Sequence, residues 1–362
     1  MLKILIWGTG QGAVKYLEKH LEMLDYIDIA AFVDGRKSDD RIEYFAIPGG
    51  TQKETISPAK ISGYSYDYIV VLSTYYEEIR NDAVNYGVDH HLIMRGTEFY
   101  LYWIKKGYLD FKKKYGAWLK KREYENVEEQ SNYVWVSWLQ GYDEAPIVIQ
   151  KCIDSIKKYS KGQNFCFITM QNYQEYVEIP DYLLRKLENG MITFTFFSDI
   201  LRLLLLDRYG GLWVDATVFC MGDFKGLYHD SDFFTFRITD KNDGRVAASW
   251  FIYSVKGHLF IKETLRLLLR YCMESEKMEH YYIIHYFFRM VTECYREVWE
   301  QYNTVEVTDC YWLGKKINEL YSIEKWKDIA DKMPVQKLNR RNKINTEKEN
   351  TFYSYITSGN EM

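Results

Sequence analysis

The stretch FSDILRLLLLDRYGGLWVDAT, residues 197–217, joins a leucine-rich helical pattern, a Gly-Gly pair and a short apolar run that ends in an acid. We expect a helix that begins at Ser198 as N-cap and carries Asp199 in its first turn, because serine caps helix N-termini and the helix dipole favours a carboxylate there. Gly210 and Gly211 predict the end of this helix, since glycine adopts the left-handed conformation that follows many helices. The residues LWVDATVF then predict a strand.

Several polar side chains of this stretch are candidates for a functional site. Arg202 follows Asp199 by one helical turn, so both side chains can point into one cleft, although a cap with a surface ion pair is the alternative. Asp215 and Thr217 share one face of the predicted strand. Two acids at these places would hold a divalent cation against a diphosphate, because their oxygens converge on one hard ion. Here Thr217 replaces the second acid. An acid in an apolar strand is costly unless it is paired or bound to metal, which favours a functional Asp215.

Strand and helix patterns alternate from Tyr133 onward. YVWVSW predicts a strand, DEAPIVIQKCIDSIKKY a helix and NFCFITM the next strand. This alternation predicts an α/β layer fold with a largely parallel sheet in a domain of residues 133–362.

The N-terminal residues 1–95 show a second strand, turn, helix, strand pattern. LKILIW and IDIAAFVD predict strands on either side of an amphipathic helix, and YDYIVVLS and HHLIM predict further strands. Gly8 and Gly10 fit the turn at which a backbone approaches a phosphate, and Asp34 stands where an acid would bind a ribose. We expect about half of a dinucleotide-binding fold, that is, a partial Rossmann-like domain. A structural glycine turn is the alternative to nucleotide or nucleotide-sugar binding.

Residues 96–132 are expected to form a linker. Within it, KKGYLDFKKKYGAWLKKR (105–122) carries eight Lys or Arg, one acid and four interleaved aromatic residues. Such a helix can lie on an anionic membrane surface. The interpretation that we favour is a linker helix whose aromatic side chains pack on a neighbouring domain. The acidic, polar stretch EYENVEEQSN completes the linker.

Composition limits the class of protein. A chain of 362 residues with 47% hydrophobic residues is long enough for two domains. A formal net charge of -4 argues against a nucleic-acid-binding protein. The six cysteines form no C-x-x-C pair, and no apolar run has the length of a membrane span. We therefore expect reduced thiols and a cytoplasmic protein, with peripheral contact at the inner face of the plasma membrane as a further expectation.

The stretch 197–217 resembles the SD..R..LL...GG.W.D region of the capsular polysaccharide synthesis family, which is related to the DXD-type family thirty-two glycosyltransferases and more distantly to the glucosylating clostridial toxins. VWVSWLQGYDEAPIVIQKCIDSI resembles the opening strand and first helix of the family, and VQKLNRR...FYSYI its C-terminal segment. The resemblance covers residues 133–356. It implies a GT-A fold, a nucleotide-sugar donor and a retaining transfer to a glycan or lipid-linked glycan acceptor.

The resemblance also implies roles at the donor site. Trp135 would lie against the base of the donor, and Asp199 and Arg202 would contact the ribose and the sugar or diphosphate. Asp215 would be the first acid of a metal-binding motif that holds Mn²⁺ or Mg²⁺. Because Thr217 stands at the second acid, the chain would have to complete the metal site with a hydroxyl, a water or a residue further on.

Two further residues are implied at the acceptor side. His285 lies on an aromatic helical stretch that relatives place near the acceptor, and Trp250 would line the sugar pocket. Core packing is the alternative for both, as it is for Trp135.

The expected function is a hexosyltransferase-type glycosyltransferase of capsular or exopolysaccharide synthesis, in which Asp215 and Arg202 act as catalytic residues by offsetting charge on the departing diphosphate. One alternative is an NAD-dependent sugar oxidoreductase, suggested by the stretch from Gly8 to Asp34, although no catalytic Tyr-Lys or His arrangement accompanies it. The other alternative is a non-catalytic sugar-binding or scaffold protein, suggested by Thr217.

Overall fold

The computed structural model describes residues 1–37, 41–124, 130–338, 346 and 348–358. The chain divides into two compact units, which are residues 1–107 with 279–281, and residues 108–278 with 282–362. The division falls inside helix α4 (Gly96–Tyr115). The domain limits expected at residues 95 and 133 remain predictions.

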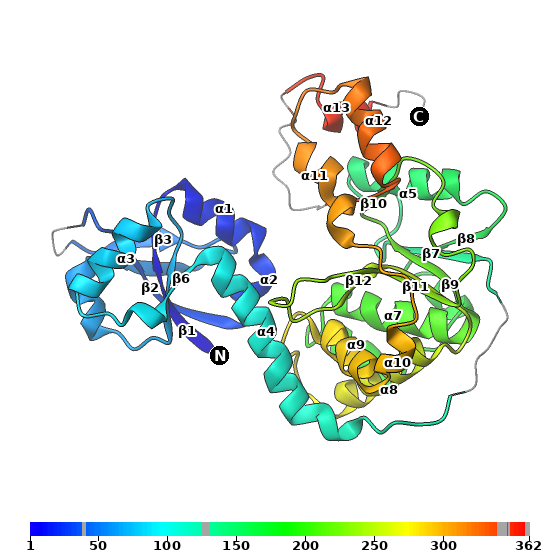
Figure 1. Ribbon diagram of the computed structural model, residues 1–362, viewed down its shortest axis with the longest axis horizontal. Helices are drawn as coiled ribbons and strands as arrows, with labels where there is room; N and C mark the ends of the chain where they lie inside the picture. Colours follow the sequence, from blue (N-terminus) through cyan, green and yellow to red (C-terminus); the bar gives the residue numbers. More distant parts are fainter. Residues whose placement is uncertain (38–40, 125–129, 339–345, 347, 359–362) are drawn as a thin grey trace. The chain divides into compact units, whose positions relative to one another are not determined.

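The first unit contains a six-stranded sheet in the order β3-β4-β2-β1-β5-β6 (Figure 1). The strands are β1 (Leu2–Trp7), β2 (Ile27–Val33), β3 (Glu43–Ala46), β4 (Gln52–Ile56), β5 (Tyr68–Val71) and β6 (Ile93–Arg95). All neighbouring pairs are parallel except β3 with β4. The strands predicted from LKILIW, IDIAAFVD, YDYIVVLS and HHLIM are confirmed.

The expected partial Rossmann-like domain is confirmed, and it is more complete than half of a dinucleotide-binding fold. The five parallel strands β4-β2-β1-β5-β6 follow the order in which a doubly wound sheet begins, with the switch point between β1 and β5. The hairpin of β3 and β4 was not predicted, because its amino-acid sequence shows no clear strand pattern. Its residues are mostly polar, and β3 lies at an exposed edge of the sheet. The helices of this unit are α1 (Gln11–Lys19), α2 (Leu21–Leu24), α3 (Tyr76–Asn85) and the first part of α4.

Three of the four aromatic residues of the segment 105–122 are buried in the second unit, and the fourth, Trp118, is half-buried. Tyr108, Phe111 and Tyr115 are 2%, 4% and 4% exposed. Phe111 and Tyr115 both contact the ring of Phe287, and the Tyr108 hydroxyl donates a hydrogen bond to Glu293. These contacts support the packed linker helix. In the acidic part of the linker, positions 125–129 lie outside the described residues. No helix in the described part of the chain combines the length and the apolar character that a membrane crossing requires.

The second unit is built on a five-stranded sheet in the order β11-β12-β9-β7-β8. The strands are β7 (Tyr133–Ser137), β8 (Asn164–Ile168), β9 (Gly211–Asp215), β11 (Phe233–Arg237) and β12 (Ala247–Ser254). Strand β7 is parallel to β8 and β9, while β12 is antiparallel to both β9 and β11. The expected α/β fold is confirmed and is consistent with a GT-A-like domain. The sheet is mixed rather than largely parallel, because β12 runs antiparallel to both of its neighbours.

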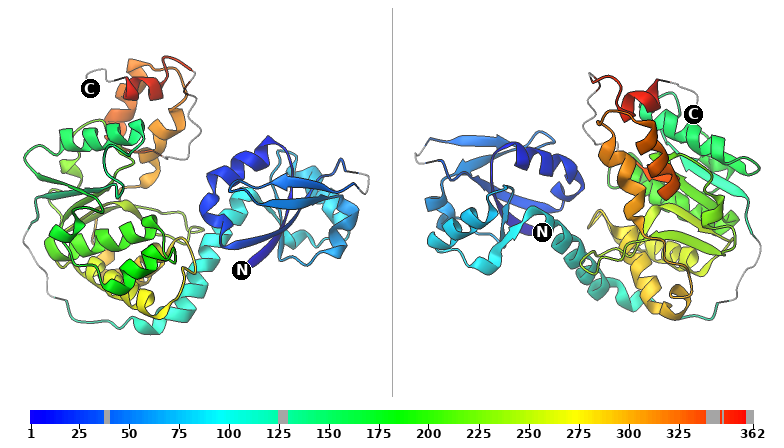
Figure 2. Two further views of the ribbon diagram at one scale, coloured as in Figure 1. Left: turned by 180° about the vertical axis from the view of Figure 1, so that it is seen from behind. Right: turned by 45° about the horizontal axis from the view of Figure 1, so that its top comes forward.

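Helices cover both faces of this sheet (Figures 1 and 2). The helices of the unit are α5 (Ile147–Tyr159), α6 (Asp181–Glu188), α7 (Phe194–Tyr209), α8 (Leu259–Glu274), α9 (Ile283–Cys294), α10 (Arg296–Trp299), α11 (Trp312–Lys316), α12 (Ile323–Lys332) and α13 (Phe352–Thr357). Helix α5 and the C-terminal helices lie on one face, with α7, α8 and α9 on the other (Figure 1). Because strand side chains alternate, Leu212 and Val214 enter the core beside α5, while Trp213 and Asp215 point to the α7 face.

Helix α7 begins five residues earlier than expected. Thr193 is its N-cap, and its side chain accepts a hydrogen bond from the backbone N–H of Phe196. The expectation of Ser198 as the cap was therefore wrong, and Asp199 lies in the second turn. Both Thr193 and Ser198 are good cap residues, so local sequence alone did not separate them.

The end of α7 agrees with the expectation. Gly210 and Gly211 have φ values of 67° and 101°, in the region that favours glycine. A Cβ on Gly210 would lie 2.6 Å from the backbone nitrogen of Lys256, so glycine is also required by space. The strand that follows is shorter than expected, because it ends at Asp215 and a turn at residues 216–217 leads to β10 (Val218–Cys220).

After β9 the chain leaves the large sheet, and the next strand, β10, pairs with the C-terminal segment. It forms an antiparallel pair with β13 (Val335–Lys337), in which Val218 lies opposite Lys337. The backbone N–H of Leu338 also donates to the carbonyl of Thr217, at 2.9 Å. This pairing places the end of β13 directly beside the end of β9. Of the polar stretch that begins at Leu338, residues 339–345 and 347 lie outside the described residues.

Candidate active site

The candidate site lies where the parallel strands β7 and β9 end. Ser137 and Asp215 are partners in the register of these strands, so their side chains point to the same face. In open α/β sheets ligands bind outside the carboxyl ends of the strands. Within the described residues, the buried hydroxyl of Ser137 has no hydrogen-bond partner. A buried hydroxyl without a partner calls for an explanation, and at this edge a bound ligand atom would supply one.

Arg202 joins the two acids of the site. Its Nη2 lies 3.0 Å from Asp199 Oδ1 and 3.4 Å from Asp215 Oδ1. Arg202 is 4% exposed and Asp199 7%, so these two side chains are almost closed to water, while the side chain of Asp215 is 25% exposed. The guanidinium also donates to the carbonyl of Ser249 and lies 5.1 Å from the centre of the Trp213 ring. These contacts fix the guanidinium at the carboxyl end of β9.

Lys337 completes this network from the other end of the domain. Its Nζ lies 2.8 Å from Asp215 Oδ2, and it also donates a hydrogen bond to the hydroxyl of Thr217. Asp215 and Thr217 therefore converge on one point, as expected, but a lysine ammonium stands there. Sequence reasoning did not single out Lys337. Its only signal was its place in VQKLNRR, the segment that carried the resemblance at the C-terminus.

The two carboxyl groups differ in their affinity for a proton. Burial raises the pKa of Asp199 to about 7; the charge of Arg202 acts against this rise and the charge of Asp215 adds to it. Burial also opposes ionisation of Asp215, but Lys337 and Arg202 outweigh it and lower the pKa of Asp215 to about 2. Asp215 additionally accepts a hydrogen bond from the indole N–H of Trp213, at 2.9 Å. Asp215 is therefore a fixed anion between two cations.

Trp135 lies in the core of the unit. Its side chain is fully buried, its indole N–H donates to the carbonyl of Gly210 at 2.8 Å, and its ring is stacked on Tyr133 at 4.7 Å. Tyr209 also packs on the ring, with the centroids 5.5 Å apart. The contact with a donor base stays a prediction, and Trp135 has no exposed ring surface to support it.

Trp250 and His285 both lie next to the charged network. The Trp250 ring is 7% exposed, is stacked on Phe236 at 5.2 Å, and its centre lies 5.7 Å from Lys337 Nζ. His285 Nδ1 lies 3.1 Å from the carbonyl of Ala247, and its Nε2 lies 3.3 Å from the hydroxyl of Ser249. Because a carbonyl only accepts, Nδ1 carries the proton and Nε2 accepts from Ser249.

His285 is held in its neutral form. Burial is the main cause that lowers its pKa to about 3, and the charges of Arg245 and Arg202 act in the same direction. Through Ser249, His285 is one residue removed from Arg202, whose guanidinium binds the carbonyl of the same serine. His285 thus contacts the network only indirectly, through Ser249.

The N-terminal candidates lie at the switch point of the first sheet. Gly8 has φ 131°, and a Cβ there would lie 3.0 Å from the carbonyl oxygen of Leu72 at the end of β5. Gly10 is the N-cap of α1 and has open space where a Cβ would be. Asp34 accepts hydrogen bonds from Thr9 and Arg36, and these contacts lower its pKa to about 2. Phosphate binding at Gly10 stays a prediction, and the carboxylate of Asp34 already has partners in its own loop.

A divalent cation does not fit the side chains at Asp215. The oxygens that would hold it are one carboxylate and the Thr217 hydroxyl, and both contact the ammonium of Lys337. Hard divalent cations require several oxygen ligands, usually with more than one carboxylate. In the described part of the chain, side chains with metal-ligand spacing occur instead at the exposed cluster Asp89, His90 and His91 of the first unit, which sequence reasoning did not notice.

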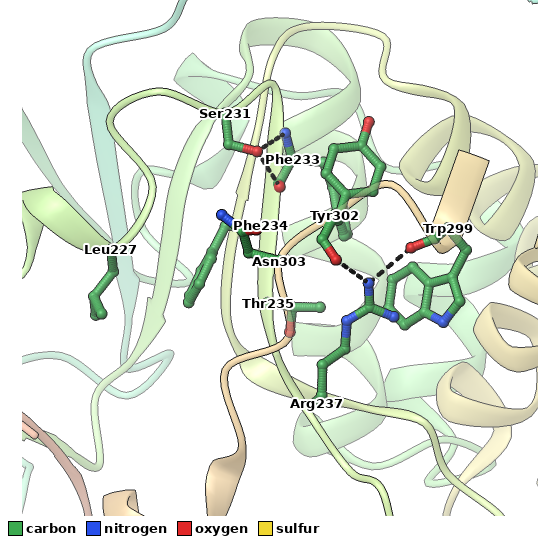
Figure 3. A pocket seen from close by; sticks show the side chains of 9 residues that line it. All are labelled: Leu227, Ser231, Phe233, Phe234, Thr235, Arg237, Trp299, Tyr302 and Asn303. Carbon is green, nitrogen blue, oxygen red and sulfur yellow. Dashed lines mark hydrogen bonds between the residues drawn. The ribbon is translucent and has the colours of Figure 1, made fainter. Parts of the chain in front are cut away.

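A separate pocket of the second unit is centred on Arg237 (Figure 3). The Arg237 guanidinium stacks on the Trp299 ring at 3.2 Å and donates to the carbonyls of Trp299 and Tyr302 at 2.8 and 3.3 Å. Burial lowers the pKa of Arg237 to about 10. None of the site residues expected from the sequence lines this pocket. Through these hydrogen bonds Arg237 links β11 to the segment that follows α9. We therefore assign Arg237 a structural role.

Comparison with known proteins places the chain in a family. Residues 90–356 match the model of the capsular polysaccharide synthesis proteins, over more than half of the chain. The chain belongs to the capsular polysaccharide synthesis protein family. A second model, described as C2185-like N-terminal, matches residues 1–94. No curated protein matches the chain.

Two solved structures are similar to the chain at a low level. The PaToxG glycosyltransferase has 15% sequence identity and a TM-score of 0.35, over 56% of this chain and 85% of that one. A putative myo-inositol dehydrogenase from Sinorhizobium meliloti 1021 has 8% identity and a TM-score of 0.19, over 83% of this chain and 98% of that one. Scores this low carry no argument about function.

Proposed function

We propose that this member of the capsular polysaccharide synthesis family is a glycosyltransferase that uses a nucleotide-diphosphate sugar. The observation that carries the proposal is the pair of cations, Arg202 and Lys337, that Asp215 holds at the carboxyl end of β9. Positive charge fixed at the mouth of an α/β sheet is suited to a diphosphate, since preorganised cations stabilise charge that develops in a transition state.

The proposed reaction is a transfer of a hexosyl group with retention at the anomeric carbon. The bond between the anomeric carbon and the diphosphate oxygen breaks, and its electron pair leaves with the nucleoside diphosphate. An acceptor hydroxyl oxygen bonds to the anomeric carbon, and its proton passes to the departing diphosphate or to water. No protein nucleophile is assigned to this reaction.

Each residue of the network has a distinct task in this proposal. Arg202 and Lys337 bind the diphosphate and offset its charge as it leaves. Asp215 holds both cations in place, and Asp199 orients Arg202 from the helix side and contacts the donor. The Ser137 hydroxyl, which lacks a partner within the described residues, contacts the donor at the end of β7.

The acceptor side is proposed at Trp250 and His285. The Trp250 ring lies beside Lys337 and supports a place for a sugar ring next to the diphosphate. His285, whose nitrogens contact Ala247 and Ser249, acts as a positioning residue for the Ser249 carbonyl that holds Arg202.

The acceptor is proposed to be a growing glycan or a lipid-linked glycan at the inner face of the plasma membrane. Lys112, Lys113 and Lys114 are among the exposed lysines of α4, and Lys112 also pairs with Glu293. They support contact with anionic lipid, because exposed cations are attracted to such surfaces. Tyr108, Phe111 and Tyr115 of the same helix take no part, since they are buried in the second unit.

The first unit is proposed as a docking or regulatory module that takes no part in the transfer. Its doubly wound strand order, with Gly8 and Gly10 at the switch point, supports binding of a nucleotide or nucleotide sugar there.

The proposal is tested with the purified full-length chain and a panel of UDP-, GDP- and dTDP-sugars. The expected result is release of nucleoside diphosphate from at least one donor, with binding of that donor by isothermal titration. A parallel titration with NAD addresses the oxidoreductase alternative. If no nucleotide sugar binds or turns over, the transferase assignment fails, and binding of NAD alone would favour the oxidoreductase.

A further inference from the structure

We propose that Lys337 takes the place of the divalent cation at the donor diphosphate, so that this chain transfers sugar without a metal ion. The inference rests on the proposed function of the same site. It concerns what supplies the positive charge next to Asp215, a question that the glycosyltransferase assignment leaves open.

The ammonium of Lys337 stands at the point on which the side-chain oxygens converge. Its Nζ lies 2.8 Å from Asp215 Oδ2 and donates to the Thr217 hydroxyl. A lysine ammonium has three N–H donors and no acceptor. Two of these donors serve Asp215 and Thr217, so one remains to point at a ligand oxygen. The Asp215 and Thr217 oxygens thereby position a cation, as the oxygens of two acids would position a metal ion.

The backbone fixes the position from which Lys337 reaches the site. Strand β13 pairs antiparallel with β10, and Lys337 lies opposite Val218, the residue that follows Thr217. The hydrogen bond from the Leu338 N–H to the Thr217 carbonyl, at 2.9 Å, extends this pairing by one residue. The Lys337 side chain is 20% exposed and that of Asp215 25%, so the pair is shielded from water but open at one side. The open side is where a diphosphate would approach.

The balance of charge explains why a threonine at position 217 is compatible with a lysine at position 337. A divalent cation bound by two acids has no net charge, and an ammonium bound by one acid has none either. Replacing one acid by a threonine and the metal by a lysine therefore leaves the charge at the diphosphate unchanged. A divalent cation beside Lys337 would face a like charge at close range, and this repulsion opposes its binding. The lysine and the metal ion exclude one another.

The first experiment measures donor turnover in the full-length chain with EDTA, with Mg²⁺ and with Mn²⁺. The expected rates agree within about twofold across the three conditions. Lys337→Met is expected to lose about a hundredfold or more of kcat/KM, because removing one contact to a developing charge has an effect of this size. Lys332→Met, which removes an exposed lysine of α12 that pairs with Asp328, serves as the matched control and should keep its rate.

The second experiment is independent of catalysis and measures Mn²⁺ binding by electron paramagnetic resonance, with and without UDP or GDP. The background carries His90→Ala and His91→Ala, so that the exposed cluster with Asp89 does not contribute. We expect no Mn²⁺ site that depends on Asp215 in this background. The variant that adds Thr217→Asp and Lys337→Met should gain one, because it restores two acids and removes the ammonium.

The two experiments separate the inference from the proposed function. A Mn²⁺ site in the background protein that is lost on Asp215→Asn, or turnover that EDTA abolishes and Mn²⁺ restores, would overturn the role of Lys337. Absence of turnover with every nucleotide sugar would instead overturn the glycosyltransferase assignment, while Mn²⁺ binding would still decide whether Asp215 holds a metal ion or the lysine.

Discussion

Lys337 and Asp215 form an ion pair of 2.8 Å across 122 residues of chain. The pair joins the end of β9, in the middle of the domain sequence, to the C-terminal strand β13. It depends on the short antiparallel pairing of β10 with β13. Through Arg202, which contacts Asp215 on its other oxygen, the pair also reaches Asp199 on α7. One carboxylate therefore connects three separate elements of the fold.

Replacing Asp215 should affect both activity and stability. We expect Asp215→Asn to lose about a hundredfold or more of kcat/KM with the best donor, because Arg202 and Lys337 lose the anion that positions them. The melting temperature should also fall, since removal of one partner leaves cations close together without their counterion. Asp331→Asn, on the exposed face of α12, is the control for a surface acid. Near-wild-type turnover of Asp215→Asn would remove this residue from the site.

Arg202 should not be replaceable by lysine. Its guanidinium contacts Asp199, Asp215 and the Ser249 carbonyl together, and a lysine ammonium is too compact to keep all three contacts. Arg202→Lys is expected to reduce kcat/KM by about tenfold or more, and Arg202→Ala by more. Steady-state kinetics with one donor and circular dichroism of each variant test this prediction. Equal rates for Arg202→Lys and the wild type would contradict it.

The buried neutral histidines should make the protein sensitive to acid. The pKa of His285 falls from an ordinary value of 6.5 to about 3 on folding, mainly through burial. Because the unfolded state binds the proton more readily, the stability that this neutral histidine contributes is present above pH 6.5 and is lost as the pH falls towards 3. Urea unfolding between pH 7.5 and about 4.5 should therefore show a decreasing free energy of unfolding.

The variant His285→Gln tests the origin of that decrease. Glutamine does not titrate, so the pH dependence of its unfolding free energy should be weaker than that of the wild type. His280, whose pKa burial also lowers to about 3, keeps its contribution in both proteins. An unchanged pH dependence in His285→Gln would show that this histidine does not contribute to acid sensitivity.

Gly210 should be intolerant of any side chain. Its φ of 67° is disfavoured for other residues, and a Cβ would lie 2.6 Å from Lys256 N and 2.8 Å from Ser254 O. Gly210→Ala is expected to lower the free energy of unfolding by about 1 to 3 kcal/mol or to prevent folding. Gly226→Ala is the matched control, because nothing lies within 4 Å of a Cβ there. Similar melting temperatures of the two variants would contradict the prediction.

The first unit should be dispensable for donor hydrolysis, provided that α4 is kept. A chain of residues 96–362 retains Tyr108, Phe111 and Tyr115, which are buried in the second unit. With Phe99 and Trp103, whose rings contact Tyr68 and Tyr26 of the first unit, replaced by serine, it is expected to fold and hydrolyse donor. A chain of residues 125–362 loses these side chains and exposes the apolar surface that they cover, so it should be unstable or aggregate. Circular dichroism, size-exclusion chromatography and nucleotide release compare the two. A folded but inactive 96–362 chain would assign the first unit a part in the chemistry.

Local patterns in the sequence were sufficient for much of the architecture. The apolar runs that became β1, β2, β5, β7 and β8 were recognisable because each is short, apolar and bounded by turn residues. The Gly210-Gly211 pair marked the end of α7, since the conformation needed there is available almost only to glycine. Local signals were weaker where two choices were equally good, as at Thr193 and Ser198, or where a polar edge hairpin such as β3 with β4 lacks an apolar pattern.

The sequence alone placed Asp199 one helical turn from Arg202, and Asp215 two residues from Thr217, because helical spacing and the strand that follows fix these short separations. That the two pairs meet, through Arg202 and Asp215, was decided by the packing of α7 against β9. Only the tertiary structure decided what they face. Lys337 reaches Asp215 and Thr217 because β10 leaves the large sheet and pairs with β13, and Trp135 is enclosed because Tyr133 and Tyr209 pack on its ring. Contacts between residues so far apart in the chain depend on the packing of whole elements, and no local spacing encodes them.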